Sequence, residues 1–264
     1  MPEGPEVKIA SNYYNSFFEG AKNMRFDVLT DYYELKYKSV FDAIKTNHPS
    51  HFVPTFTIGK NLFIPLNHEL YFNFHLGMTG SWSLENIKHC HFKVSSNIGE
   101  LYFRDVRKFG KMRVLKMDEL TSKHNTQFDV LHENYDLNAH ISFLAEKISP
   151  NRSICSALMD QRYFPGVGNY IKSEVLYAAN IHPENKWCQL SQKKISSLIK
   201  CVKDIMHHSY QTGGAELKDF KNPFDQSKFT LKVYGKTSDP HGRPVKSLLT
   251  SDQRKSWFCP SLQK

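Results

Sequence analysis

LMDQRYFPGVGNYIKSEVLY, residues 158–177, is the most specific pattern in the chain. Gly166 and Gly168 have no side chain, which lets the backbone there come close to a phosphate. The residues that follow are typical of a helix, whose first N–H groups point at such an anion. Asn169 can cap this helix or bind the phosphate through its side chain. The segment therefore predicts a phosphate-binding turn at the start of a helix.

The sequence on either side of this segment separates into helical and strand-like regions. Helical patterns cover residues 5–19, 137–148, 153–161, 169–179 and 191–208. The region from about 25 to 116 has a strand-like texture, with aromatic and β-branched runs at 52–58, 62–66, 70–74, 92–94, 101–103 and 112–115. Similar runs return at 229–234, 245–249 and 255–259. We therefore expect an α+β fold of two domains: an N-terminal β-sandwich with flanking helices (1–125), and a C-terminal helical domain (126–228) that ends in a β-hairpin (229–264).

The composition favours a nucleic-acid partner. The 264 residues include 35 Lys and Arg against 26 Asp and Glu, a formal charge of +9, which suits a phosphate-rich surface. No apolar run is long enough to cross a membrane, and the N-terminal residues lack the pattern of a secretory signal. Five cysteines without a C-x-x-C pair favour a reducing, intracellular compartment, which in a eukaryote would be the nucleus.

The N-terminal residues MPEGPEV contain a candidate nucleophile. Removal of Met1 would leave Pro2 with a free α-amino group, whose pKa is about 7.7–8.0, against about 10.4 for lysine. More of this amine is neutral at pH 7, and its attack on the anomeric carbon of a sugar gives an iminium ion. Glu3 and Glu6 follow closely and can donate a proton or orient the amine. Acids in a first helical turn also suit the helix dipole, so a structural role stays open.

Together these features resemble the Fpg/Nei family of DNA glycosylases over nearly the whole chain. The start PEGPEV looks like the Nei-type, or endonuclease VIII-like, branch, and residues 158–177 are similar to the family's helix–two-turn–helix element. The resemblance implies that Pro2 is the Schiff-base nucleophile, Glu3 the general acid and Glu6 a supporting carboxylate. It also implies DNA phosphate contacts from Gly166, Gly168 and Asn169.

Two further motifs follow in the family's order. TIGKNLFI, residues 57–64, places Lys60 in a tight turn, where the family keeps a catalytic lysine. FHLGMTGSW, residues 74–82, is similar to the family's H-L-G-M-[ST]-G segment. By this resemblance His75 faces a phosphate and Met78 enters the space that the damaged base has left. Without the resemblance, a turn lysine would be solvated and the methionine would pack in a core.

FRDVRKFGKMRV, residues 103–114, resembles the family's D-x-R-R-F-G loop, with Lys108 in place of the second arginine. The resemblance implies that Arg107 pairs with the orphaned base and that Phe109 wedges between neighbouring bases. Apolar wedges unstack a base step, and enzymes that act on a base in a duplex must first extrude it.

The C-terminal segment 233–264 resembles the family's zinc-finger hairpin without its ligands. The two C-x-x-C pairs of zinc-bearing members fall here on His241, Pro244, Cys259 and Leu262. Structural zinc needs four good ligands, so we expect no metal and no other cofactor. The segment looks like the zincless finger of one branch of the family.

The same hairpin retains an arginine that the resemblance places at its tip. Arg254 would bind the phosphates that flank the lesion, which suits a forked guanidinium. We expect packing of Leu249, Trp257 and Phe258 to hold the hairpin in place of a metal.

The motifs together predict a monomeric, bifunctional DNA glycosylase/AP lyase of base-excision repair, acting on damaged DNA by β,δ-elimination. Its expected substrates are oxidised pyrimidines, formamidopyrimidines and hydantoins. The loop at 217–229 lacks the glycine-rich stretch of the 8-oxoguanine branch, so we expect weak activity on that base. A lesion-binding protein without catalysis is an alternative. A sequence-specific zinc-finger-type protein is a second alternative, which the missing ligands disfavour.

Overall fold

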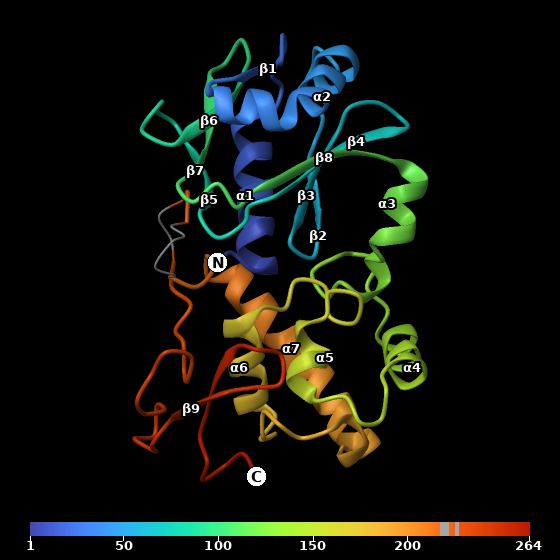
Figure 1. Ribbon diagram of the computed structural model, residues 1–264, viewed down its shortest axis with the longest axis vertical. Helices are drawn as coiled ribbons and strands as arrows, with labels where there is room; N and C mark the ends of the chain where they lie inside the picture. Colours follow the sequence, from blue (N-terminus) through green and yellow to red (C-terminus); the bar gives the residue numbers. More distant parts are fainter. Residues whose placement is uncertain (217–221, 225–226) are drawn as a thin grey trace. The chain divides into compact units, whose positions relative to one another are not determined.

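The computed structural model describes residues 1–216, 222–224 and 227–264 (Figure 1). The chain divides into two compact units. The N-terminal unit comprises Met1–Pro2, Glu6–His124 and Glu216–Ser227; the C-terminal unit comprises Glu3–Pro5, Asn125–Ala215 and Lys228–Lys264. The loop at 217–229, from which we expect weak activity on 8-oxoguanine, falls largely on residues 217–221 and 225–226, outside the described residues.

Antiparallel strands of the N-terminal unit form two sheets, which confirms the predicted sandwich. One sheet has the order β1 (Arg25–Val28), β6 (Cys90–Ser95), β7 (Glu100–Asp105), β5 (Gly80–Ser83). The other has the order β2 (Phe56–Ile58), β3 (Asn61–Pro65), β4 (Leu70–His75), β8 (Lys111–Lys116).

Aromatic side chains fill the core of the sandwich. Phe72 and Phe74 of β4 are fully buried, as are Phe92 of β6 and Phe103 of β7. The ring of Phe74 lies 5.5 Å from that of Phe103 and 6.2 Å from that of Phe92, in edge-to-face contacts. Because side chains alternate along a strand, Asn73 then faces away from this core. The outer face of the β2-β3-β4-β8 sheet is thereby free to carry polar groups.

Helix α1 (Gly4–Phe18) packs on this core, and in Figure 1 it runs between the labels of the two sheets. Its buried residues Val7, Ala10, Tyr14 and Phe18 follow helical spacing. The indole N–H of Trp82 donates to the carbonyl of Ala10 at 3.1 Å. The helix thereby fixes the position of the residues before it.

The strand-like region 25–116 also contains a long helix, α2 (Asp31–Asn47), which the sequence interpretation missed. Its buried residues Tyr33, Tyr37, Phe41 and Ile44 recur every three or four positions. This spacing was a readable signal, and the aromatic content of the region concealed it. A second helix, α3 (Met117–Lys123), follows β8 directly.

Four α-helices in the described C-terminal unit lie close to the predicted positions: α4 (Leu137–Lys147), α5 (Ile154–Met159), α6 (Asn169–Ala178) and α7 (Gln192–Gln211). A 3-10 turn, η1 (Thr126–Phe128), precedes α4, and a second, η2 (Trp187–Gln189), lies between α6 and α7. Side chains of Asp136, Ser153 and Ser191 cap the first turns of α4, α5 and α7. The hairpin of β9 (Lys246–Leu249) and β10 (Lys255–Phe258) closes the chain.

The predicted strand at 229–234 does not form. The N–H groups of Lys232, Val233 and Tyr234 donate instead to the carboxylate of Glu174 on α6, each at 2.9 Å. A strand would need these donors for its ladder, so the carboxylate replaces the ladder.

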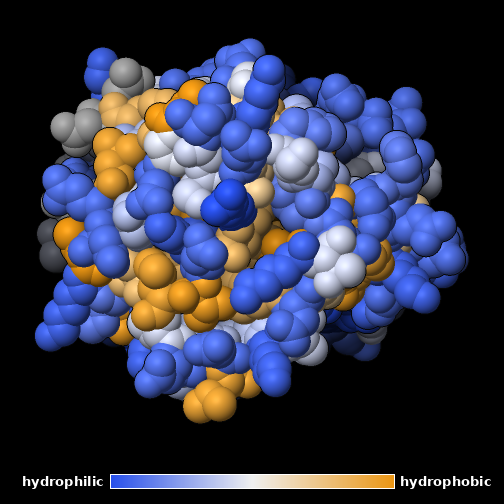
Figure 2. Space-filling model, turned by 90° about the horizontal axis from the view of Figure 1, so that it is seen from above, coloured by the Kyte–Doolittle hydropathy of each residue, from blue (hydrophilic) through white to orange (hydrophobic). Residues whose placement is uncertain are grey.

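Hydrophilic side chains dominate the face of the molecule in Figure 2, where apolar atoms form an irregular band. Exposed apolar side chains include Leu35 at 83%, Leu84 at 59% and Phe109 at 49%. Within the described ranges, no helix combines the length and the apolar character that a membrane crossing requires.

Candidate active site

Glu3 binds the start of α6. Its Oε2 accepts the N–H of Gly168 at 2.6 Å and that of Ile171 at 3.3 Å, and its Oε1 accepts the N–H of Tyr170 at 2.9 Å. Both oxygens are buried with the residue, which is 2% exposed. The first N–H groups of a helix have no intrahelical partner and carry the positive end of its dipole. Glu3 therefore acts as the anionic cap that the glycine in the N-cap position cannot supply.

The two-glycine turn before α6 is held by Gln161. The side-chain oxygen of Gln161 accepts the N–H of Gly166 at 3.1 Å, and its amide donates to the carbonyl of Val167 at 2.9 Å. Gly166 has φ of +87°, a conformation that favours glycine. Its carbonyl accepts the N–H of Gly4 at 2.9 Å. The predicted phosphate-binding turn thus also anchors residues 3 and 4.

Asn169 is the first residue of α6, and its side chain reaches the terminal hairpin. Its Nδ2 donates to the carbonyl of Lys255 at 3.0 Å. The same side chain also hydrogen-bonds that of Tyr234, so a phosphate contact from this amide would replace one of these two bonds. Arg254 precedes Lys255 and is exposed at the turn between β9 and β10. The structure therefore brings Asn169 and the backbone beside Arg254 together.

A buried ion pair joins α6 to the hairpin turn. Lys172 Nζ lies 2.6 Å from Asp252 Oδ2, and the two side chains are 0% and 5% exposed. Asp252 Oδ1 accepts the hydroxyl of Thr250 at 2.5 Å and the N–H of Arg254 at 3.3 Å. This pair, which the sequence did not suggest, holds the turn that carries Arg254.

The zinc-ligand positions of the family do not fit a metal here. Cys259 is buried in an apolar cluster with Tyr177, Val233 and Leu262, and its thiol contacts Ser261 Oγ at 3.2 Å. His241 is exposed, and a proline and a leucine, which have no side-chain donor atom, occupy the other two positions. In the part of the chain that the structure describes, no three His, Cys, Asp or Glu side chains cluster in a way that could hold a metal ion.

Polar contacts of Asp239 hold the segment before the hairpin. Its carboxylate accepts the N–H groups of His241 and Arg243 at 2.9 Å, the Arg243 Nε at 2.6 Å and the Tyr177 hydroxyl at 3.0 Å. Desolvation opposes its charge, but these hydrogen bonds prevail and lower the pKa of Asp239 to about 2.

The apolar packing expected for the hairpin is found only in part. The prediction for Leu249 is wrong, because that side chain is 69% exposed. Trp257 is partly buried and Phe258 is buried, as expected.

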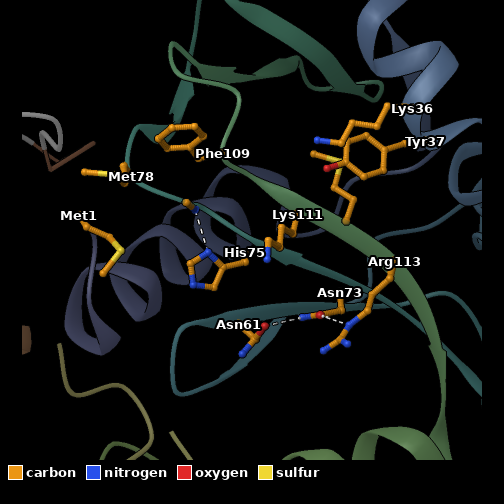
Figure 3. Close-up of a pocket in the computed structure, with 12 residues that line it drawn as sticks. Met1, Lys36, Tyr37, Asn61, Asn73, His75, Met78, Phe109, Lys111 and Arg113 are labelled. Atoms are coloured by element: carbon orange, nitrogen blue, oxygen red, sulfur yellow. Dashed lines mark hydrogen bonds between the residues drawn. The ribbon is translucent and has the colours of Figure 1, made fainter. Parts of the chain in front are cut away.

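Three predicted residues of the N-terminal unit line one cavity of about 750 Å³ (Figure 3). His75 comes from the end of β4, Met78 from the following loop and Phe109 from the loop before β8. Met1 lines the same cavity. Pro2, the next residue in the chain, is buried.

His75 is neutral at pH 7. Burial, together with the ammonium groups of Lys60 and Lys111, lowers the pKa of His75 to about 4. Its Nδ1 accepts the N–H of Gly77 at 2.9 Å, so the ring proton lies on Nε2. The imidazole can therefore donate one hydrogen bond to a phosphate without carrying charge.

The loop with Arg107 and Phe109 is anchored by Asp105. Its Oδ2 accepts the N–H of Gly110 at 2.7 Å, and its Oδ1 accepts the hydroxyl of Thr79 at 2.5 Å. The Arg107 guanidinium stacks over the Phe109 ring at 4.7 Å. Both side chains are exposed, so the wedge and the base-pairing arginine predicted from sequence lie together.

Lys60 and Glu6 are both buried. Lys60 is 6% exposed in the turn between β2 and β3, as predicted from TIGKNLFI, and Glu6 is 0% exposed in α1. The predicted site residues thus form two groups. One lies in the N-terminal unit, and the other, with Glu3, Gly166, Gly168, Asn169 and Arg254, lies in the C-terminal unit.

Comparisons with known proteins find family matches in both halves of the chain. Residues 1–112 match the formamidopyrimidine-DNA glycosylase N-terminal domain, and residues 128–221 match the formamidopyrimidine-DNA glycosylase H2TH domain. The formamidopyrimidine-DNA glycosylase of Rickettsia bellii is 30% identical over 278 aligned positions, covering 100% of both chains. The chain belongs to the formamidopyrimidine-DNA glycosylase family. This family comprises DNA glycosylases of DNA repair, and the predicted Fpg/Nei membership is confirmed.

Two further proteins are similar over most or nearly all of the chain. The formamidopyrimidine-DNA glycosylase of Listeria innocua is 34% identical over 206 positions, covering 72% of this chain and 74% of its own. A complex of the Lactococcus lactis Fpg with DNA containing an abasic site has a TM-score of 0.83 at 24% identity, covering 99% of each chain. The structural likeness establishes the two-domain fold. The Nei-like subtype stays a prediction.

Proposed function

We propose that this family member is a bifunctional DNA glycosylase/AP lyase that uses the Pro2 amine as its nucleophile. The observation that carries the proposal is the place of Met1 in the wall of the cavity, with His75, Met78 and Phe109. The nitrogen of Pro2 is bonded to Met1, so removal of Met1 would leave a secondary amine at this cavity. That amine would meet a sugar whose base has been extruded.

The proposed reaction balances without a cofactor. The Pro2 nitrogen bonds to the anomeric carbon, and the damaged base leaves with the electron pair of its glycosidic bond and takes up a proton. The ring opens to an iminium ion. Loss of a proton from the adjacent carbon expels the 3′ phosphate, and a second elimination expels the 5′ phosphate. Water then releases the sugar fragment and regenerates the amine.

The hydrogen bonds of Glu3 restrict how it can act in this reaction. The three backbone N–H groups that it accepts stabilise its carboxylate form. A role as general acid therefore requires Glu3 to take up a proton and release at least one of these bonds. We propose that the bound sugar oxygen displaces the longest of them, from Ile171 at 3.3 Å.

The proposed substrate is damaged DNA. Arg254, Asn169 and the turn at Gly166 and Gly168 would bind the phosphates near the lesion, while Met78, Arg107 and Phe109 would fill the space of the extruded base. We propose oxidised pyrimidines, formamidopyrimidines and hydantoins as the bases removed, with weak activity on 8-oxoguanine. The names of the relatives support the formamidopyrimidines in this set. We also propose a monomer that acts in a reducing intracellular compartment.

Borohydride trapping on a duplex with an abasic site tests this proposal. Protein with Pro2 at its N-terminus, verified by mass spectrometry, should form a covalent complex. A matched form that retains Met1, or is acetylated on Pro2, should bind the same duplex without cross-linking. Efficient trapping of the blocked form would refute the Pro2 mechanism. Binding without trapping by either form would support a lesion-binding protein that lacks catalysis.

A further inference from the structure

We propose that Arg113, with Lys111 beside it, forms an additional subsite for a backbone phosphate of the bound DNA. The subsite lies on the outer face of the β2-β3-β4-β8 sheet, and the family resemblance implied no role for either residue. The inference rests on the proposed function, because that function supplies the DNA. Its evidence is the way in which neighbouring side chains hold the Arg113 guanidinium.

A row of polar side chains crosses three strands at this position. Asn73 on β4 is the cross-strand partner of Arg113 on β8, and Asn61 lies on the adjacent strand β3. Arg113 Nε donates to Asn73 Oδ1 at 3.0 Å, and Asn73 Nδ2 donates to Asn61 Oδ1 at 3.4 Å. Figure 3 shows this row along one side of the cavity. Asn73 is 3% exposed, so the acceptor that orients the guanidinium is itself fixed by packing.

The second support of the guanidinium is also neutral. Arg113 Nη2 lies 3.3 Å from His124 Nε2. Burial and the charge of Arg113 lower the pKa of His124 to about 4, so its ring accepts rather than repels at pH 7. Arg113 forms no ion pair with any carboxylate among the described residues. The protein thus orients this cation through direct contacts with two uncharged acceptors, and Glu119 interacts with it only at longer range.

The other charged side chains that line the cavity are also positive. Lys111 lies two residues before Arg113 on the same face of β8 and is the cross-strand partner of His75. Lys36 reaches the cavity from α2, where its ammonium group contacts the ring of Tyr37 at 5.1 Å. No Asp or Glu lines this cavity within the described ranges. A concave wall with fixed cations and a neutral imidazole donor is suited to a phosphodiester.

The geometry also favours a backbone contact over base recognition. A side chain that reads a base edge must present a unique set of donors in a groove, whereas a phosphate accepts from any donor. Arg113 already uses Nε and one Nη2 hydrogen for its own support, which leaves two hydrogens on Nη1 and one on Nη2 for a ligand. The same wall carries His75, for which the resemblance also implies a phosphate. We therefore expect the Arg113 contact to add affinity irrespective of the base removed.

The salt dependence of DNA binding tests this subsite. The probe is a duplex with a tetrahydrofuran abasic analogue, which binds without turnover. Arg113→Met should weaken its binding and reduce the slope of log Kd against log salt by about 0.9, the value for one lost phosphate contact. The ratio of the Arg113→Met Kd to the wild-type Kd should then fall by roughly 3.5-fold between 50 and 200 mM salt. Arg113→Lys should keep part of the slope.

Arg25→Met is the matched control, since it removes one exposed charge from β1 in the other sheet. Circular dichroism and thermal unfolding should show that both variants fold. An unchanged slope for Arg113→Met, or an equal change for both variants, would overturn the subsite. The same titration on undamaged duplex separates the two proposals. If wild type bound lesion and undamaged duplexes equally, the lesion-specific function would fail, while the Arg113 slope would still decide the subsite.

Discussion

Glu3 and Gly168 are 165 positions apart in the chain, and they pack in direct contact with no space for a side chain at position 168. Glu3 Oε2 accepts the Gly168 N–H at 2.6 Å, and a Cβ added to Gly168 would lie 2.3 Å from Glu3 Cδ. The glycine is therefore required by the carboxylate that caps α6. Any side chain at position 168 must displace Glu3.

Gly168→Ala should displace the Glu3 carboxylate and lower stability by about 2 kcal/mol, the size of a lost helix cap with its charge. Urea denaturation measures this loss. Trapping of lesion DNA should fall in parallel, because Glu3 adjoins the nucleophile. In the Glu3→Ala background, which removes the Cγ and Cδ atoms that an added Cβ would meet, Gly168→Ala should cost clearly less. An equal cost in both backgrounds would show that Glu3 does not constrain position 168.

Lys172→Met should lower the free energy of unfolding by about 3–5 kcal/mol, because it leaves Asp252 buried without its partner. Adding Asp252→Asn should recover part of that loss, since no uncompensated charge then remains. Chemical denaturation of the three variants gives the comparison. Affinity for an abasic-analogue duplex should fall with Lys172→Met in an Arg254-containing protein and hardly change after Arg254→Ala. A similar loss of affinity in both backgrounds would contradict the view that this pair positions Arg254.

His140 makes stability depend on pH. It is 0% exposed, its Nε2 lies 2.6 Å from the carbonyl of Tyr163, and burial lowers its pKa to about 4. The unfolded state, with a pKa near 6.5, binds a proton first as the pH falls, so stability is full above about 6.5 and is lost progressively down to about 4. His140→Gln should be less stable at pH 7. Its further loss between pH 7 and 5 should be about 2 kcal/mol smaller than that of wild type. Equal losses would refute a neutral buried His140.

Phe109→Ala should weaken binding to an abasic-analogue duplex by about 1–3 kcal/mol, the range for one lost base-stacking contact. Stability should change by less than about 0.5 kcal/mol, because the ring is 49% exposed. Fluorescence anisotropy gives the affinity. Leu35→Ala, an exposed apolar residue on α2, should leave the affinity unchanged. A Phe109 effect on undamaged duplex as large as on the lesion duplex would argue against a wedge role.

The local patterns of the sequence were enough to place the two-glycine turn, α6 after it, α1 and most strands of the sandwich. Each of these depends on residues that are near neighbours, such as Gly166 and Gln161, or on a period of two or of about 3.6. Helix α2 carried the same kind of signal in Tyr33, Tyr37 and Phe41, and its aromatic residues were mistaken for strand texture.

Tertiary structure decided what the charged residues do. Glu174 accepts three N–H groups of residues 232–234, and so a run with strand-like composition forms no strand. Asp239 and the Lys172–Asp252 pair hold the hairpin where packing of Leu249 was expected. Arg113 is a phosphate candidate only because Asn73 meets it across the sheet. Composition and period determine where an element begins, whereas the partner of a buried charge is set by atoms that come from distant parts of the chain.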